Sequence, residues 1–271
     1  MLRTHGLTKN FGGLTAVDDV DFDLGEELCS LIGPNGAGKT TFFDLLTGAL
    51  EPTAGTIELQ VDGEWVDVTD DTTAETATMG LHRSYQITNV FPSASVLENV
   101  RVAAQAHGEH AATFWRRADD YGAYIDEARA ILERVGLDER AEDVAGNLSH
   151  GASRQLEVAI ALAGDPDVLL LDEPNAGVSS ESVDDIIGLI EDVAEDHAVL
   201  LVEHNMDIVM EVSDRVVVLN QGSVIADGPP GAVRDDPAVQ QAYLGGYEAG
   251  DLAGADITGD GTGDGAGEGL T

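Results

Sequence analysis

Eight residues near the N-terminus have the types and spacing of a phosphate-binding loop. The segment Gly33-Pro34-Asn35-Gly36-Ala37-Gly38-Lys39-Thr40 fits the pattern G-x-x-x-x-G-K-[ST]. Glycines allow backbone N–H groups to converge on phosphate oxygens, and the start of a helix adds a favourable dipole. We expect Lys39 to reach the β- and γ-phosphates and Thr40 to bind Mg²⁺. The other nucleotide-binding candidates are Asn35, Gly36, Gly38 and Thr41.

Two carboxylates follow an apolar run in the second half of the chain. Val168–Leu171 is followed directly by Asp172 and Glu173. Ligands bind beyond the carboxyl ends of strands in open α/β sheets, so both side chains are placed for chemistry. We expect Asp172 to hold Mg²⁺ through water and Glu173 to polarise the attacking water. Acidic residues that merely end a strand are the alternative, and the phosphate-binding pattern argues against it.

The elements that must position these residues alternate between strands and helices. Apolar runs at Leu28–Ile32, Val168–Leu171, Val199–Val202 and Val216–Leu219 are typical of strands buried in a parallel sheet. Helical spacing follows at 41–50, 182–194 and 206–212. This alternation predicts an α/β fold with a mostly parallel sheet. The segment Asn220–Ser223 predicts a closing hairpin.

Two stretches depart from this alternation. Alternating apolar residues in Val17–Leu24 and Ile57–Val61 predict antiparallel strands, the second paired with Trp65–Val68 across a turn at Asp62-Gly63. Helical spacing over 96–106, 124–135 and 153–163 predicts a helical subdomain inserted at about 90–163. We expect one domain over 1–246. Residues 247–271, rich in Gly and Asp, form a disordered tail on this interpretation.

The charge balance limits the possible partners. Thirteen basic residues face 51 acidic ones, for a net charge of -38. A chain this acidic lacks the basic footprint of nucleic-acid binding. The acidic residues are spread along the chain, and their repulsion destabilises the compact state unless molar salt shortens the Debye length to roughly 3 Å. We interpret the charge as adaptation to a high-salt cytoplasm.

The sequence predicts no direct membrane insertion. No apolar run approaches the length of a membrane span, and no signal segment opens the chain. Any transport role therefore requires a separate membrane-spanning partner. The single cysteine, Cys29, lies in an apolar run and excludes an internal disulfide, as in a reducing cytoplasm. We expect it to be a small buried residue.

Together these motifs resemble the ATP-binding subunit of an ABC transporter, over nearly the whole chain up to about Gly246. Leu148–Ala152 is similar to the signature motif LSGGQ of that family. Ser149 and Gly151 match its functional positions, whereas His150 and Ala152 depart from it. The resemblance implies that Ser149 and Gly151 contact nucleotide held by the opposite subunit of a dimer. Taken alone, the five residues fit a simple helix N-cap.

The same resemblance implies further site residues. Gln86 matches a glutamine that contacts Mg²⁺ and senses the membrane partner. His204 resembles a histidine that contacts the γ-phosphate. Asn175–Ser179 matches the loop that communicates between the two ATP sites. Phe11, upstream of the first expected strand, matches an aromatic residue that lies against adenine.

Several segments are similar to the ATPases of branched-chain amino acid importers. They are Phe11–Val17, Leu97–Val100, Leu201–Asp207 and Ala242–Gly245. Alternatives are the ATPase of an importer for urea or short amides, an exporter ATPase, a soluble ABC ATPase, and a regulatory module that does not turn over ATP. A soluble ABC ATPase usually carries a coiled coil or a second cassette, and neither is found. Glu173 and His204 argue against the regulatory module.

The resemblance implies a shared catalytic site. Each subunit supplies the phosphate-binding loop, the Mg²⁺ ligand and Glu173, and the signature motif of a second ATPase subunit encloses the γ-phosphate. The cofactors are ATP and Mg²⁺, and the dimer is either homomeric or heteromeric. Coupling to transmembrane permease subunits passes near Gln86 and Phe91–Val100. The expected location is cytoplasmic, peripheral on the inner face of the cell membrane.

Overall fold

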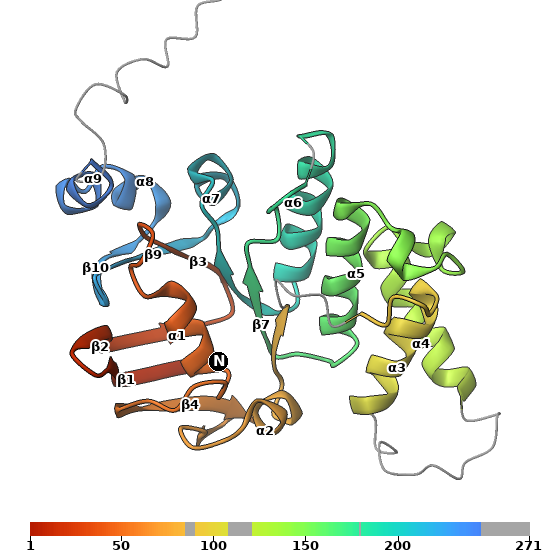
Figure 1. The fold of residues 1–271 in the computed structure, drawn as a ribbon, viewed down its shortest axis with the longest axis horizontal. Coiled ribbons are helices and arrows are strands. Elements are labelled where there is room, and N and C mark those ends of the chain that lie inside the picture. Colours follow the sequence, from red (N-terminus) through yellow and green to blue (C-terminus); the bar gives the residue numbers. More distant parts are fainter. Residues whose placement is uncertain (85–89, 108–120, 179, 245–271) are drawn as a thin grey trace, which may run out of the picture.

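The computed structural model describes residues 1–84, 90–107, 121–178 and 180–244. These residues form a six-stranded sheet and a four-stranded sheet. Helix α1 (Lys39–Leu46) lies between the two sheets, and further helices flank the larger one (Figure 1). The architecture is therefore of the α/β class, as the sequence predicts.

The six-stranded sheet carries the ends from which the candidate site is built. Its strands lie in the order β10-β9-β3-β8-β7-β6, and all neighbours are parallel except β9 and β10. Because β3, β8 and β7 are parallel neighbours, the loops that follow them meet at one edge. The strands are β3 (Leu28–Ile32), β6 (Leu81–Ser84), β7 (Val168–Asp172), β8 (Ala198–Val202), β9 (Arg215–Asn220) and β10 (Ser223–Gly228).

The four-stranded sheet is antiparallel, with the order β2-β1-β4-β5. Its strands are β1 (Leu2–Phe11), β2 (Leu14–Leu24), β4 (Ala54–Val61) and β5 (Glu64–Asp67). Asp62 and Gly63 both have positive φ, as a tight turn between β4 and β5 requires. Side chains of β1, β2 and β4 pack with Phe42, Phe43 and neighbouring residues of α1 in one buried cluster. This packing fixes the helix that starts at the phosphate-binding loop.

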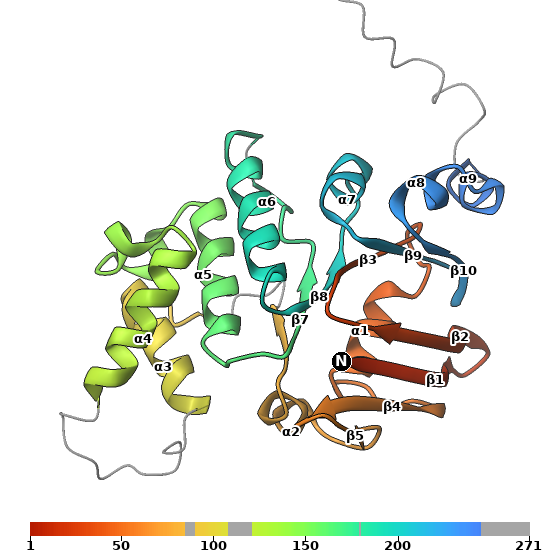
Figure 2. The same cartoon turned by 180° about the vertical axis from the view of Figure 1, so that it is seen from behind.

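The helices lie in three groups (Figures 1 and 2). α3, α4 and α5 gather at one end of the molecule, beyond β6 and β7, while α8 and α9 lie at the other end beside β10. α6 and α7 lie between these groups, and short α2 precedes β6. The bounds are α2 (Thr73–Thr78), α3 (Val96–His107), α4 (Tyr121–Arg134), α5 (His150–Leu162), α6 (Ser180–Ala194), α7 (Met206–Val212), α8 (Pro230–Arg234) and α9 (Pro237–Leu244), with 3-10 turns at Asp138–Arg140 and Ala145–Asn147.

The structure corrects three local predictions. The helix expected over 41–50 begins earlier, at Lys39, and ends at Leu46, because Gly48 has positive φ and stops it. The helix expected from Ser153 begins at His150, with Ser149 as its N-cap. Phe11 does not lie upstream of the first strand, since it is the last residue of β1. The predicted tail, 247–271, lies outside the described residues.

Cys29 is fully buried and free, in agreement with its predicted role as a small apolar residue. Burial raises the pKa of its thiol to about 12. In the described part of the chain, no helix has both the length and the apolar character needed to cross a membrane.

Candidate active site

The phosphate-binding loop is held between β3 and α1 by close backbone contacts. Gly38, the N-cap of α1, has φ 108, and a Cβ on it would lie 2.3 Å from the Ala16 carbonyl oxygen. The Ala37 carbonyl accepts a hydrogen bond of 2.9 Å from the N–H of Gly222, in the β9–β10 turn. The close approach of Ala16 explains why position 38 requires glycine. Both contacts show that segments distant in sequence hold the loop in its shape.

Lys39 bends back over its own loop. Its Nζ donates to the Gly33 carbonyl at 2.6 Å and to the Pro34 carbonyl at 3.3 Å, and the residue is only 7% exposed. Burial lowers the pKa of the ammonium, while the Glu173 and Asp172 carboxylates act in the opposite direction. The Lys39 Nζ thus lies at the centre of the loop, where it can donate hydrogen bonds to phosphate oxygens.

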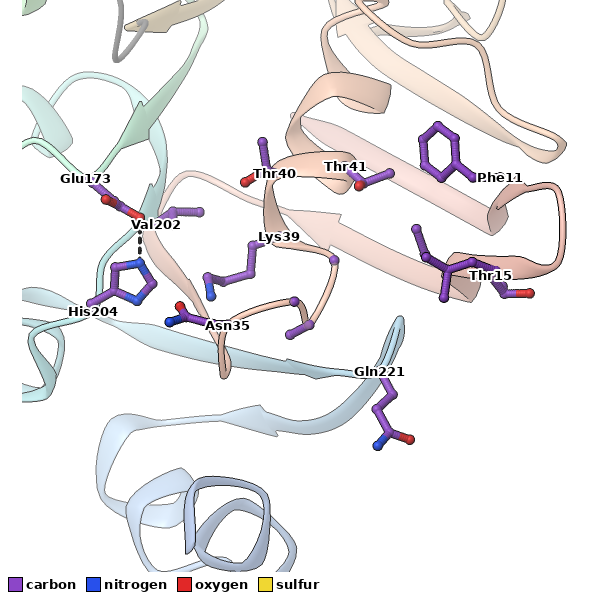
Figure 3. Close-up of a pocket in the computed structure, with 15 residues that line it drawn as sticks. Phe11, Thr15, Asn35, Lys39, Thr40, Thr41, Glu173, Val202, His204 and Gln221 are labelled. Atoms are coloured by element: carbon purple, nitrogen blue, oxygen red, sulfur yellow. Dashed lines mark ion pairs between the residues drawn. The ribbon is translucent and has the colours of Figure 1, made fainter. Parts of the chain in front are cut away.

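Glu173 and His204 meet at the ends of β7 and β8. His204 Nε2 lies 2.5 Å from Glu173 Oε1, and the dashed line in Figure 3 marks this pair. Glu173 has φ 49, an uncommon conformation for a non-glycine residue, and its N–H donates to the Val202 carbonyl at 2.9 Å. A carboxylate paired with an imidazole is an arrangement that can orient a water molecule and move a proton.

Glu203 stabilises the backbone beneath this pair. It is 5% exposed, and its carboxylate accepts hydrogen bonds from the N–H groups of His204 at 3.1 Å and Asn175 at 3.2 Å. It thereby joins the loop after β8 to the loop after β7. Sequence reasoning missed Glu203, although a carboxylate that directly follows the apolar run Val199–Val202 is a usable signal.

Asp172 makes a contact that the sequence did not predict. Its Oδ2 lies 2.7 Å from Arg83 Nη2, and Arg83 Nη1 lies 2.6 Å from Asp44 Oδ1. The Arg83 side chain is 6% exposed and lies over the Phe43 ring. Arg83 thus connects the end of β6 to the carboxylate expected to hold Mg²⁺. Only the register between β6 and β7 places these residues together, so the sequence offers no signal for the pair.

A pocket of about 620 Å³ extends from this centre to the edge of the antiparallel sheet. Lys39, Thr40, Glu173 and His204 lie on one side of it, and Phe11 lies on the other (Figure 3). The Phe11 ring is 47% exposed, with Lys9 Nζ 5.4 Å from its centroid. A nucleotide has a flat base at one end and anionic phosphates at the other. A pocket with an apolar ring on one side and a phosphate-binding loop on the other therefore suits a nucleotide. The lining also includes Asn35, Gly36, Gly38 and Thr41.

The donor set suits Mg²⁺ held together with phosphate. Among the described residues there is no cluster of three or more His, Cys, Asp or Glu side chains that would cage a metal. Mg²⁺ is usually bound by one or two protein oxygens, with water and substrate phosphates completing the shell. The Thr40 hydroxyl, in the first turn of α1, and the Asp172 carboxylate supply oxygens of this kind.

Ser149, Gly151 and Asp172 are predicted site residues that do not line the pocket. Ser149 caps α5, where its Oγ accepts from the Ala152 N–H at 3.4 Å, and Gly151 lies in the first turn of that helix. Neither residue lines the pocket described above. Gln86 falls outside the described residues. Of the segment Asn175–Ser179, Ser179 also falls outside them, and Asn175 lies beside Glu203.

Comparison with known proteins agrees with this geometry. The ABC transporter family matches residues 17–176, and a family described as branched-chain amino acid ATP-binding cassette transporter matches residues 223–249. The "High-affinity branched-chain amino acid transport ATP-binding protein LivG" of Salmonella typhimurium is 40% identical over 261 residues, covering 90% of this chain and 98% of that protein. BraF of Pseudomonas aeruginosa, with the same description, is also 40% identical, with 90% and 98% covered.

An archaeal relative and a solved structure extend the match. A "Probable branched-chain amino acid transport ATP-binding protein LivG" of Archaeoglobus fulgidus is 33% identical, covering 92% of this chain and 97% of that protein. The crystal structure of the ADP conformation of MJ1267, an ATP-binding cassette of an ABC transporter, superposes with a TM-score of 0.75 at 28% identity, covering 90% of this chain and 98% of that one. With its phosphate-binding loop, Glu173 and His204 in one pocket and Asp172 at the end of β7, the chain belongs to the ABC transporter family of ATPases.

Proposed function

We propose that this ATPase powers an importer of branched-chain amino acids. The observation that carries the hydrolytic part is the Glu173–His204 pair beside Lys39, in a pocket large enough for a nucleotide. A phosphate cradle alone would bind ATP, whereas a carboxylate and an imidazole beside it can activate water. The substrate class follows from the relatives described above, since the transported molecule does not touch this chain.

The proposed roles follow the geometry. Lys39 and the backbone of Asn35, Gly36 and Gly38 bind the phosphates, Thr41 supports them, and Phe11 lies against adenine. Glu173 positions the attacking water, and His204 holds that carboxylate and contacts the γ-phosphate. Thr40, Asp172 and Gln86 would hold Mg²⁺, which neutralises charge on the phosphates when bound.

The active site needs a second subunit on this proposal. Ser149 and Gly151 lie away from the pocket of their own chain, at the N-terminus of a 13-residue helix. A helix N-terminus is suited to phosphate binding, and a second ATPase subunit would present its own to the nucleotide held here. ATP then joins two subunits, and hydrolysis releases them. Permease subunits would hold the dimer at the inner face of the membrane.

We also propose that the acidity is an adaptation to a high-salt cytoplasm. A net charge of -38 on 271 residues produces strong self-repulsion that molar salt screens. Dialysis from molar KCl into dilute buffer should remove part of the far-UV CD signal. Full structure and ATPase activity in dilute buffer would contradict this adaptation.

We further propose that residues 1–246 form one domain, with a helical subdomain inserted at about 90–163.

The function is tested by uptake in cells. A strain that lacks this gene should take up labelled leucine, isoleucine and valine more slowly, and the wild-type gene should restore uptake. The Lys39→Ala variant should not restore it, because the phosphates lose their main cation. Purified chain should carry permease subunits with it. Loss of urea uptake with unchanged leucine uptake would favour the urea importer instead.

A further inference from the structure

The buried residue Glu203 accepts hydrogen bonds from two loops through its two carboxylate oxygens. Its Oε1 accepts from the N–H of Asn175 at 3.2 Å, and its Oε2 accepts from the N–H of His204 at 3.1 Å. Glu203 directly follows β8, whereas Asn175 lies in the loop that follows β7. Each oxygen therefore holds a different loop of the candidate active site.

The loop after β7 contains a backbone conformation that its surroundings must enforce. Glu173 has φ 49, in the left-handed region that residues other than glycine rarely adopt. Such a conformation persists only where neighbouring contacts hold it. The Glu173 N–H donates to the Val202 carbonyl at 2.9 Å, and two residues later the Asn175 N–H donates to Glu203. Two successive residues, 202 and 203, thus restrain the backbone that aims Glu173 at His204.

The same loop adjoins open space into which it could relax. A pocket of about 390 Å³ lies on the other side of the Glu173–His204 pair, and its lining includes Asn175 and Glu203. The side-chain amide of Asn175 is buried and has no hydrogen-bond partner among the described residues, so it supplies no bond that would anchor the loop. The backbone bond from Asn175 to Glu203 therefore opposes movement of the loop into this pocket.

A carboxylate is suited to holding two N–H groups at once. Its two oxygens both accept hydrogen bonds, and it carries no competing N–H donor. A glutamine of the same size has one acceptor oxygen, and its NH₂ group would face a backbone N–H without being able to accept from it. Position 203 therefore depends on the carboxylate itself, and the size of the side chain alone does not suffice.

We propose that Glu203 is a positioning residue that holds Glu173 and His204 together in the geometry that orients the attacking water. Its side chain does not line the nucleotide pocket, so it acts on the reaction through the two loops that it joins. Loss of its bonds should slow the chemical step and leave nucleotide affinity nearly unchanged. This proposal rests on the proposed catalytic role of Glu173.

Glu203→Gln is the decisive variant, because it keeps the size of the side chain and removes one acceptor. Glu203→Asp keeps both oxygens and shortens their reach by one methylene, so it tests the same bonds if the first variant fails to fold. Glu75→Gln is the matched control, since Glu75 accepts from the Thr72 N–H at the start of α2 and does not line the pocket. The single-turnover rate with ATP, the Kd for fluorescent ADP in EDTA and the thermal midpoint are measured in molar KCl.

Glu203→Gln should lower the single-turnover rate about tenfold to a hundredfold, the range for a lost hydrogen bond to a carboxylate. Glu203→Asp should lower it at least about threefold. The Kd should change by less than about twofold in both, because the phosphate-binding loop is untouched. Glu75→Gln should leave the rate and the Kd at wild-type values. A lower thermal midpoint with a wild-type rate in the Glu203 variants would show a merely structural role and overturn the proposal.

The double variant Glu173→Gln/Glu203→Gln tests whether Glu203 acts through Glu173. Its rate should lie within about twofold of that of Glu173→Gln alone, because the group that Glu203 positions is already gone. A further loss as large as in the wild-type background would contradict the positioning role. Hydrolysis at the wild-type rate by Glu173→Gln would refute the proposed catalytic role itself. Slow hydrolysis by that variant, with a wild-type rate for Glu203→Gln, would refute only the positioning role, so the two failures are distinguishable.

Discussion

Replacing Arg83 by methionine should destabilise the protein far more than loss of an exposed ion pair. The Arg83 guanidinium joins Asp44 of α1 to Asp172 of β7, with N–O distances of 2.6 and 2.7 Å, and the side chain is 6% exposed. Methionine keeps the length and apolar character of the side chain, and it removes the charge and the donors. The perturbation therefore leaves two carboxylates without this cation.

The expected magnitude follows from the burial of those carboxylates. Removal of one partner from a buried ion pair typically costs about 3–5 kcal/mol, because the other charge remains without compensation. The Asp44 side chain is 37% exposed and can be rehydrated, whereas Asp172 is only 11% exposed. We therefore expect a somewhat smaller cost than this, about 2–4 kcal/mol. For a chain of this size that corresponds to a fall in the thermal midpoint of roughly 5–12 °C.

The assay is thermal and urea unfolding followed by far-UV CD in molar KCl. Arg129→Met is the matched control, because Arg129 pairs with Glu142 and the two side chains are 53% and 79% exposed. That variant should cost less than about 1 kcal/mol. In the double variant Arg83→Met/Asp172→Asn neither charge remains, so its cost should be lower than the sum of the single variants by at least about 1 kcal/mol. Equal costs for Arg83→Met and Arg129→Met, or strict additivity in the double variant, would refute the reasoning.

Three further outcomes follow from local structure. Because burial raises the pKa of the Cys29 thiol from 9.0 to about 12, alkylation of the native protein near pH 8 should be roughly a thousandfold slower than that of the urea-unfolded chain; equal rates would contradict the burial. Gly38→Ala should cost at least about 2 kcal/mol and abolish nucleotide binding, since φ is 108 and the new Cβ would lie 2.3 Å from the Ala16 carbonyl oxygen; unfolding and ADP titration measure both. Burial, with a contribution from His107, holds the pKa of His82 below 6.5. The neutral imidazole therefore contributes fully to the stability of the fold above that pH, and this contribution is lost as the pH falls and the buried ring must be protonated. His82→Asn should therefore flatten the fall in thermal midpoint between about pH 7 and 5, and an unchanged slope would contradict this.

The parts of the fold with strong local signals could be predicted from the sequence. The phosphate-binding loop has a fixed spacing, and the buried strands are continuous apolar runs, so the structure confirms the parallel sheet and the hairpin between β9 and β10. The pair Asp62-Gly63 likewise predicted its turn correctly. In each case the residues that determine the feature lie next to one another in the chain.

Short helices and long-range pairs gave no comparable signal. The Thr73–Thr78 helix is one turn and a half long, and its capping box, Thr72 with Glu75, was the only local clue. The contact of Arg83 with Asp172 depends on strand register, and that of Asn175 with Glu203 depends on how the loops after β7 and β8 meet. Such contacts are products of tertiary packing, so periodicity and motif spacing do not encode them.

The measurement that tests the account most directly is single-turnover hydrolysis of labelled ATP by Glu173→Gln. This substitution keeps the size of the side chain and its place beside His204, and removes the carboxylate that would orient water. We predict that the variant binds ATP with nearly wild-type affinity, forms an ATP-dependent dimer, and hydrolyses ATP about 10²- to 10⁴-fold more slowly. Hydrolysis at the wild-type rate would contradict the role of Glu173 and the catalytic site built around it.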